Sequence, residues 1–137
     1  MLAKDLMSTG VFTLSSEATV GEALEALVRQ HISGAPVIDA AGGIFGVLTE
    51  EDLMLYYEYP DEFRPEAKLK DARVQGAGLV TRGLISVSPE TPAEEIATLF
   101  IGRKIKRVPV VQGGRILGIV SRRDLLKGLL ASQTQKP

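Results

Sequence analysis

One stretch of this chain occurs twice, and the repetition limits what the chain can fold into more than any other feature. Gly118-Ile119-Val120-Ser121-Arg122-Arg123-Asp124 matches the earlier Gly46-Val47-Leu48-Thr49-Glu50-Glu51-Asp52. In each copy apolar residues follow a glycine, a hydroxyl residue ends the apolar run, and an aspartate stands three positions later. This order predicts a buried strand that runs directly into a helix, because Ser or Thr with an acid three residues later is typical of a helix start.

The repetition extends over most of the chain. Pro109 follows Pro36 by 73 positions, whereas Asp124 follows Asp52 by 72. One residue is therefore lost between these points, in a glycine-rich hairpin turn, where a change of length does not move the strands. Self-similarity of this kind predicts one supersecondary unit used twice.

Hydrophobic spacing predicts similar elements in the two copies. In the first copy we expect a strand over 12–14, a helix from Thr19 to about His31, a hairpin of 36–38 with 44–48, and a helix from Glu50 that ends at Pro60. In the second we expect a strand over 85–87, a helix with Pro92 at its first position, a hairpin of 108–111 with 116–120, and a helix to about Ala131.

These elements divide the chain into a first repeat, 1–59, and a second repeat, 76–131. Residues 60–75 are polar and interrupted by proline, so they are predicted to be a connector, and 132–137 to be a flexible tail. Tyr56, Tyr57 and Tyr59 stand just before the connector. They either cap the core or form an exposed aromatic patch that docks a partner.

Composition excludes several functions. With 16 basic and 17 acidic residues the chain has no net field to recruit nucleic acid. The amino terminus lacks the apolar core of a signal peptide and no run approaches the ~20 apolar residues of a membrane span, so we expect a cytoplasmic protein with no membrane partner. The absence of cysteine and the single histidine, His31, leave no parts for a nucleophile–base pair or a zinc site. The chain is therefore not expected to be an enzyme or to hold a metal.

The residues of both copies resemble the cystathionine-β-synthase (CBS) domain. The matching pieces are 6–9, 11–14, 31–39 and 46–52 in the first copy and 84–87, 104–111 and 118–124 in the second. The resemblance covers nearly the whole chain apart from the connector and the tail. It implies a stand-alone α/β module of two β-α-β-β-α repeats that pack as a pseudo-twofold pair.

The resemblance also implies a function. Paired CBS units hold adenosine-containing ligands in the cleft between them, most often AMP, ADP or ATP, with S-adenosylmethionine or NAD also possible and no cofactor required. Such a module senses the energy state and signals to a regulated protein, of unknown identity here, or to its own oligomer. Two composite sites are implied. One would combine Thr49, Asp52, Val80, Ile85, Ile105, Lys106 and Arg107, and the other Met7, Phe12, Ile32, Ser33, Gly34, Ser121, Arg122, Arg123 and Asp124.

Charge predicts that the site with Arg122 and Arg123 binds phosphate more tightly, because Lys106 and Arg107 must first offset acidic neighbours at the other site. A rival interpretation is a ligand-free oligomerisation or protein-interaction module, in which both Ser/Thr-x-x-Asp motifs are only helix caps. A twofold homodimer is expected in either case, since the helices after each hairpin carry apolar residues on more than one face, namely Leu53, Leu55, Leu126 and Leu129.

Overall fold

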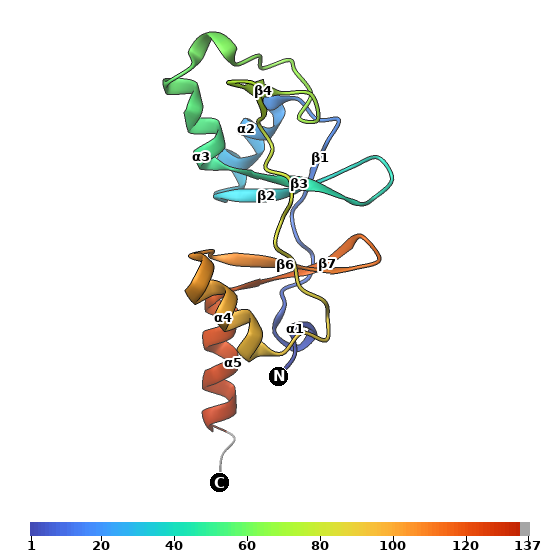
Figure 1. The fold of residues 1–137 in the computed structure, drawn as a ribbon, viewed down its shortest axis with the longest axis vertical. Helices are drawn as coiled ribbons and strands as arrows, with labels where there is room; N and C mark the ends of the chain where they lie inside the picture. Colours follow the sequence, from blue (N-terminus) through green and yellow to red (C-terminus); the bar gives the residue numbers. More distant parts are fainter. Residues whose placement is uncertain (135–137) are drawn as a thin grey trace. The chain divides into compact units, whose positions relative to one another are not determined.

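The computed structural model describes residues 1–134, which form two compact units (Figure 1). Unit 2 is one continuous piece, Phe12–Leu84, whereas unit 1 joins Met1–Val11 to the chain from Ile85 onward. The predicted α/β class is confirmed: each unit contains a β-hairpin that is followed directly by a helix. The amino-terminal residues belong to the unit of the second repeat, because Ala3 is fully buried there beside Ile96 and Phe100.

Unit 2 is built on a three-stranded sheet in the order β1 (Leu14–Ser15), β2 (Gly34–Ile38), β3 (Ile44–Thr49). Strand β1 runs parallel to β2, and β2 and β3 form the predicted antiparallel hairpin. Helix α2 (Val20–Gln30) connects β1 to β2 and buries Val20, Ala23 and Leu27. Helix α3 (Glu50–Met54) follows β3 and continues into a 3-10 turn, Leu55–Tyr57.

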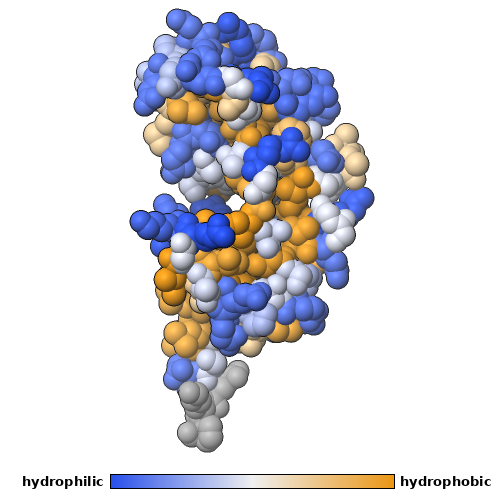
Figure 2. Space-filling view, viewed as in Figure 1, coloured by the Kyte–Doolittle hydropathy of each residue, from blue (hydrophilic) through white to orange (hydrophobic). Residues whose placement is uncertain are grey.

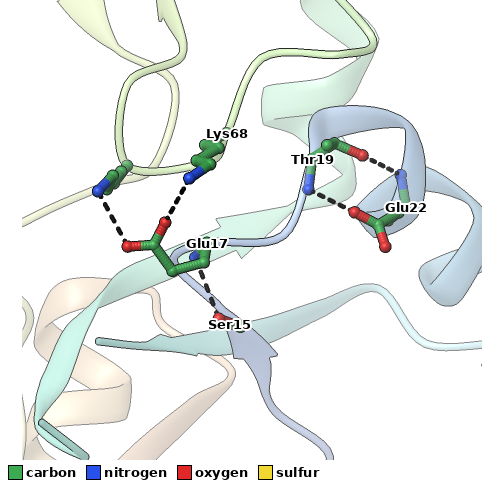
Figure 3. A network of polar contacts seen from close by, with 6 residues as sticks. Ser15, Glu17, Thr19, Glu22 and Lys68 are labelled. Atoms are coloured by element: carbon green, nitrogen blue, oxygen red, sulfur yellow. Dashed lines mark hydrogen bonds and ion pairs between the residues drawn. The ribbon is translucent and has the colours of Figure 1, made fainter. Parts of the chain in front are cut away.

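The start and end of α2 are as predicted. The Thr19 hydroxyl accepts a hydrogen bond from the Glu22 N–H (3.1 Å), and the Glu22 carboxylate accepts one from the Thr19 N–H (2.9 Å; Figure 3). His31 ends the helix with a φ of 55°, and Lys104, 73 positions later, ends the equivalent helix with a φ of 54°. Both repeats therefore stop this helix with the same left-handed residue position.

Residues 60–75, predicted as a connector, pack onto unit 2. They contain a 3-10 turn (Pro60–Glu62) and contribute Leu69, Ala72 and Val74 to the core. The Glu17 carboxylate forms ion pairs with two lysines of this segment, Lys68 (3.0 Å, Figure 3) and Lys70 (2.9 Å). A small hairpin of β4 (Arg73–Val74) and β5 (Ala77–Gly78) follows, and Gln75 and Gly76 make its turn with positive φ.

Unit 1 contains α1 (Ala3–Leu6), α4 (Ala93–Arg103), β6 (Arg107–Gln112), β7 (Arg115–Ser121) and α5 (Arg122–Thr134). Strands β6 and β7 form the second predicted hairpin. Its core is made of branched and aromatic residues, namely Val87, Ile96, Phe100, Val108, Val110 and Val120. Helix α5 continues three residues past the predicted end at Ala131, and residues 135–137 of the predicted flexible tail lie outside the described part of the chain.

Two predicted details of unit 1 are wrong. The strand expected over 85–87 is reduced to one parallel bridge between Val87 and Val110. Pro92 precedes α4 instead of occupying its first position, and the N–H of Ala93 is donated to the carbonyl of Met1 (2.9 Å). A main-chain contact from the distant amino terminus thus satisfies a helix start that the local pattern assigned to Thr91 and Pro92.

Candidate functional site

Each hairpin ends at a strand-to-helix junction that contains the same reciprocal pair of hydrogen bonds between main chain and side chain. At the end of β3, the Asp52 carboxylate accepts from the Thr49 N–H (2.9 Å) and hydroxyl (3.0 Å), and the Asp52 N–H donates to Thr49 Oγ1 (3.3 Å). At the end of β7, the Asp124 carboxylate accepts from the Ser121 N–H (2.8 Å), and the Asp124 N–H donates to Ser121 Oγ (3.1 Å). Both motifs are capping boxes, and all four side chains are half-buried.

The segment before each proline lies beside the junction of its own repeat. Gly34 pairs with Thr49, and the Glu50 N–H donates to the Ser33 carbonyl (2.8 Å). In unit 1, Arg107 pairs with Ser121, and the Arg122 N–H donates to the Lys106 carbonyl (3.2 Å). The hairpin register therefore places Ser33 and Gly34 beside Thr49, and it places Lys106 and Arg107 beside Ser121. The sets implied by the resemblance are crossed: they group Lys106 and Arg107 with Thr49, and Ser33 and Gly34 with Ser121.

A segment from the opposite repeat completes each junction. Thr81 exchanges two main-chain hydrogen bonds with Val47 (both 2.9 Å), and Ser8 exchanges two with Ile119 (2.9 and 3.0 Å). These lead segments, 7–8 and 80–81, place Met7 on the strand that ends at Ser121 and Val80 on the strand that ends at Thr49. Met7 and Val80 thus lie beside the motifs with which the sequence grouped them.

A glycine in the middle of each strand permits this contact. A Cβ at Gly46 would overlap the Thr81 carbonyl oxygen and lie 2.6 Å from Val80 Cγ1. A Cβ at Gly118 would lie 2.7 Å from the Ser8 carbonyl oxygen and 2.8 Å from Met7 Sδ. From the sequence, Gly46 and Gly118 fall within the predicted strands 44–48 and 116–120. A glycine inside an apolar strand is itself a signal of close backbone approach, and it points to Ser8 and Thr81.

The remaining predicted site residues are dispersed within the two units. Ile32 packs against the core of unit 2, and Ile85 and Ile105 pack against the core of unit 1. Phe12 is exposed just before β1. Arg122 lines a hollow between α4 and α5, and Arg123 beside it is exposed.

We call the residues gathered at each junction a corner. The unit 2 corner consists of Ser33, Gly34, Thr49, Asp52 and Val80, and the unit 1 corner of Met7, Lys106, Arg107, Ser121 and Asp124. Over residues 1–134 no three His, Cys, Asp or Glu side chains gather closely enough to hold a metal ion. The helices in that part of the chain all fall short of the length and apolar content that a bilayer crossing requires.

Comparison with known proteins agrees with the repeat. The chain is 31% identical over 135 residues to a CBS domain-containing protein of Dictyostelium discoideum, and the match covers 95% of this chain and 92% of that one. It is 35% identical over 130 residues to an A-adding tRNA nucleotidyltransferase of Aquifex aeolicus, of which it spans only 14%. The protein CBSX2, solved in complex with AMP, superimposes with a TM-score of 0.79 at 25% identity, and the match covers 96% of this chain and 98% of that one.

The family model of the CBS domain matches this chain twice. The two matched segments are residues 3–59 and 77–131, which correspond to the two copies of the repeat. Together they cover more than half of the sequence. The chain therefore belongs to the CBS domain family and carries two CBS domains in tandem.

Proposed function

We propose that this chain is a regulatory module that binds an adenosine nucleotide, AMP, ADP or ATP, and signals its occupancy to a regulated protein or to its own oligomer. The observation that carries the proposal is the corner, which is built twice from the same parts. Each corner joins a Ser/Thr-x-x-Asp helix start, the segment before a proline, and a lead segment from the opposite repeat. The likeness to a protein solved with AMP supports the same ligand class.

The chemistry of the unit 1 corner suits a nucleotide. Helix α5 is 13 residues long, and the positive end of its dipole lies at this corner. The capping bond uses Oδ2 of Asp124, so a ribose hydroxyl would bind through Oδ1. The predicted base-binding residues Phe12, Ile32, Ile85 and Ile105 are all apolar, which suits an adenine ring.

Charge distinguishes the two corners. Lys106, Arg107 and Arg123 place cations on the segments that form the unit 1 corner. In unit 2 the equivalent segments carry Ser33, Gly34 and Glu51. We therefore expect the unit 1 corner to bind a phosphate-bearing ligand more tightly, and the unit 2 corner to favour an adenosine compound with less negative charge, such as S-adenosylmethionine.

Thermal unfolding with added ligands tests the proposal. A ligand that binds only the folded state raises its free energy of unfolding by RT ln(1 + [L]/Kd), about 2.7 kcal/mol at a hundredfold excess over Kd. AMP, ADP, ATP, S-adenosylmethionine and NADH are added in parallel to the purified chain. We expect at least one of the nucleotides to raise Tm in a concentration-dependent manner, and a flat response to all five ligands contradicts the proposal.

Asp124→Ala locates the site. A charge-assisted hydrogen bond to a ribose hydroxyl contributes roughly 1.5–3 kcal/mol, so we expect about a ten- to hundredfold weaker Kd by titration calorimetry with AMP and ATP. Loss of a cap alone costs about 0.5–2 kcal/mol of stability. The matched control is Glu22→Ala, which breaks the capping box of α2 away from both corners and should lower Tm without changing Kd. Asp52→Ala reports on the unit 2 corner in the same way.

The capping boxes also favour a second candidate function, a ligand-free assembly module. In that case Asp124→Ala behaves like Glu22→Ala, with a lower Tm and no measurable nucleotide binding in either protein. We propose a regulatory and not a catalytic role in both cases, and the cytoplasmic location stays a prediction from the sequence.

We further propose that the chain forms a homodimer. Large apolar side chains on its helices are exposed to solvent, among them Ile101, Leu126, Leu129 and Leu130 in unit 1 and Val28, Met54 and Tyr57 in unit 2. Exposed apolar patches of this kind mark association surfaces. Light scattering at micromolar concentration should give the mass of a dimer, and a monomer mass contradicts the proposal.

A further inference from the structure

Basic residues gather at one end of unit 1. They stand at the C-terminal end of α4, in the stretch that leads into β6, and in the first two turns of α5, and these segments together contain only one acidic residue, Asp124. All of the basic side chains are exposed. We call these seven residues, which are Arg103, Lys104, Lys106, Arg107, Arg122, Arg123 and Lys127, the basic end. In Figure 2 strongly hydrophilic residues, drawn in dark blue, lie over the part of unit 1 where α4 ends and β6 begins.

Main-chain contacts bring the segments of the basic end together. Arg107 pairs with Ser121 in the hairpin, and the Arg122 N–H donates to the Lys106 carbonyl (3.2 Å). The end of α4 leads directly into this pairing. Lys127 follows Arg122 by about one and a half turns of α5. The basic end is therefore one continuous surface.

The first repeat shows that the fold does not require these charges. Unit 2 forms the same hairpin, ends its helix α2 with the same left-handed residue position, and has the same capping box. Its positions equivalent to the basic end contain no lysine or arginine, and two of them are acidic. They are Gln30, His31, Ser33, Gly34, Glu50, Glu51 and Leu55.

The electrostatics of α5 oppose two of the arginines. The dipole of α4 favours Arg103 at the C-terminal end of that helix, but Arg122 and Arg123 stand in the first turn of α5, where the dipole is positive. The equivalent residues of α3, Glu50 and Glu51, have the sign that a helix start favours. An anionic partner outside the chain would offset the charge that α5 itself disfavours.

The charges of the basic end are also less neutralised than cations elsewhere. Several lysines and arginines in other segments form ion pairs with glutamates, namely Lys4, Arg29, Lys68 and Lys70. Arg103, Lys104 and Lys127 form no ion pair with any of the residues from 1 to 134. The balance of 16 basic and 17 acidic residues, from which the sequence predicts no attraction to nucleic acid, therefore conceals a local excess of positive charge.

We propose that the basic end of unit 1 binds the phosphate backbone of a nucleic acid. Guanidinium groups bind phosphate through paired hydrogen bonds, and a continuous surface of exposed lysine and arginine is the electrostatic signature of nucleic-acid binding. The centre of a protein–protein interface is depleted of charged residues, so this surface fits a polyanion better than an acidic protein. Contacts to phosphate carry no sequence information, and the binding should therefore be independent of sequence and sensitive to salt.

Fluorescence anisotropy tests the proposal. The probe is a labelled single strand of about 20 nucleotides, prepared as RNA and as DNA, which share the phosphate chemistry. We expect a Kd in the micromolar range at about 50 mM salt, and log K should fall with log[salt] with a slope of about −3 to −5 if about four to seven phosphates are contacted. Absence of binding to both strands at about 50 mM salt overturns the proposal.

A triple variant locates the surface. Arg103→Gln, Lys104→Gln and Lys127→Gln are combined, because none of these residues is a predicted nucleotide-binding residue. Arg103→Gln also gives unit 1 the residue that unit 2 has at this position, Gln30. We expect the Kd for the strand to rise at least about tenfold at about 50 mM salt, and the salt slope to become shallower by about 2. The melting temperature shows whether the variant is folded.

The matched control removes the same charge from unit 2. Arg29→Gln, Lys68→Gln and Arg82→Gln replace three exposed cations outside the basic end, and the Kd for the strand should stay within about threefold of the unmodified chain. Equal weakening by the control and by the triple variant of the basic end would mean that net charge alone decides binding, which overturns the proposed surface.

Two further measurements separate this proposal from its rivals. Poly-glutamate of the same number of charges is the probe for an acidic protein, and tighter binding of poly-glutamate than of either nucleic-acid strand overturns the proposal. Calorimetry with AMP and ATP should give the same Kd for the triple variant and the unmodified chain. Loss of nucleotide binding with retained strand binding contradicts the proposed function alone, and the reverse result contradicts this proposal alone.

Discussion

Helix α2 of unit 2 and helix α4 of unit 1 occupy the same place in the repeat, but they start in different ways. Side chains cap α2, through the reciprocal bonds of Thr19 and Glu22. The start of α4 instead uses a main-chain carbonyl, that of Met1, which accepts from the Ala93 N–H. The requirement that the first N–H groups of a helix find partners is common to both repeats, whereas the group that meets it depends on which segment lies nearby.

The cores of the two units also differ in whether the repeat itself or a segment outside it supplies the buried groups. Ala23 in α2 corresponds to Ile96 in α4, and both are fully buried. Unit 2 receives additional apolar residues from outside the repeat, namely Leu69, Ala72 and Val74. We call residues 60–75 the covering segment. In unit 2 this segment supplies apolar side chains to the core, where the helix has the small Ala23; in unit 1 the helix itself supplies the larger Ile96, and the repeated backbone is the same.

The largest expected effect comes from exchanging this core position. Ile96→Ala gives unit 1 the residue that unit 2 has, without the covering segment, so a cavity should remain. We expect a loss of about 2–5 kcal/mol in the free energy of unfolding, measured by chemical denaturation. Ile101→Ala, at an exposed position of the same helix, is the matched control and should change stability far less. A small loss for Ile96→Ala would mean that unit 1 collapses around the missing volume.

Substitution of the strand glycines, Gly46 and Gly118, compares how closely the lead segment packs at each corner. Gly46→Ala and Gly118→Ala each force a Cβ against the lead segment, and overpacking of this kind costs about 1–3 kcal/mol. A Cβ at either position meets a main-chain carbonyl, but Gly46→Ala should cost more, because the carbonyl is nearer there and the second contact is the buried Val80, whereas at Gly118 the second contact is the flexible Met7 side chain. Gly102→Ala in α4 meets no atom within 4 Å and should stabilise the protein slightly. Equal melting temperatures for Gly46→Ala and the unmodified chain contradict the close contact.

The difference in helix starts predicts a smaller effect. Thr19→Ala removes the side-chain cap of α2 and should cost about 0.5–2 kcal/mol in a denaturant titration. Thr98→Ala is the control in α4, since its hydroxyl only bonds back to the Glu94 carbonyl within the helix. Thr98→Ala should be neutral or slightly stabilising. If both threonine variants behave alike, the cap does not contribute to stability.

The smallest expected effect is a pH dependence of unit 2. Hydrogen bonds from Lys70 and Lys68 lower the pKa of Glu17 from its ordinary value of 4.5. A lowered folded pKa stabilises the protein above the unfolded value, and this contribution is lost as the pH falls through the folded pKa. Glu17→Gln should therefore lower Tm slightly at pH 7, and the difference from the unmodified chain should shrink in acid.

Glu66→Gln, an exposed position of the covering segment, is the control for the loss of one negative charge. It should have less effect at pH 7 than Glu17→Gln. Since the Glu17 pair is on the surface, the effect should also weaken in high salt. A Tm difference that persists unchanged at pH 2 contradicts the ion pair as its cause.

Much of the fold could be predicted because its signals are local. Thr19 and Glu22 mark a helix start, His31 stands where that helix ends, and the glycine turns mark both hairpins. The burial of residues in 60–75, which the sequence predicted to be a connector, could not be predicted for the opposite reason. Leu69, Ala72 and Val74 are spaced among polar residues without helix or strand periodicity, so no local pattern shows that they are buried.

For the candidate site, the motif was predictable and its neighbours were less so. The hydroxyl and the acid of each corner follow from spacing alone, and their bonds are those of a capping box. The position of the segment before each proline depends on hairpin register, which places Gly34 opposite Thr49 and Arg107 opposite Ser121. Register is a tertiary outcome, set by which strand residues turn towards the core.

By itself, the sequence of this protein determined that a strand–helix unit occurs twice, that each copy has a Ser/Thr-x-x-Asp helix start, and that the charge beside the two motifs is opposite. Only the tertiary structure decided that residues 1–11 complete the unit of the second repeat, that 60–75 cover the first, and that Gly46 and Gly118 admit main-chain segments from the opposite repeat. The physical reason is range. Caps, turns and amphipathic spacing act over a few residues, whereas burial and close main-chain packing depend on segments that are distant in the chain.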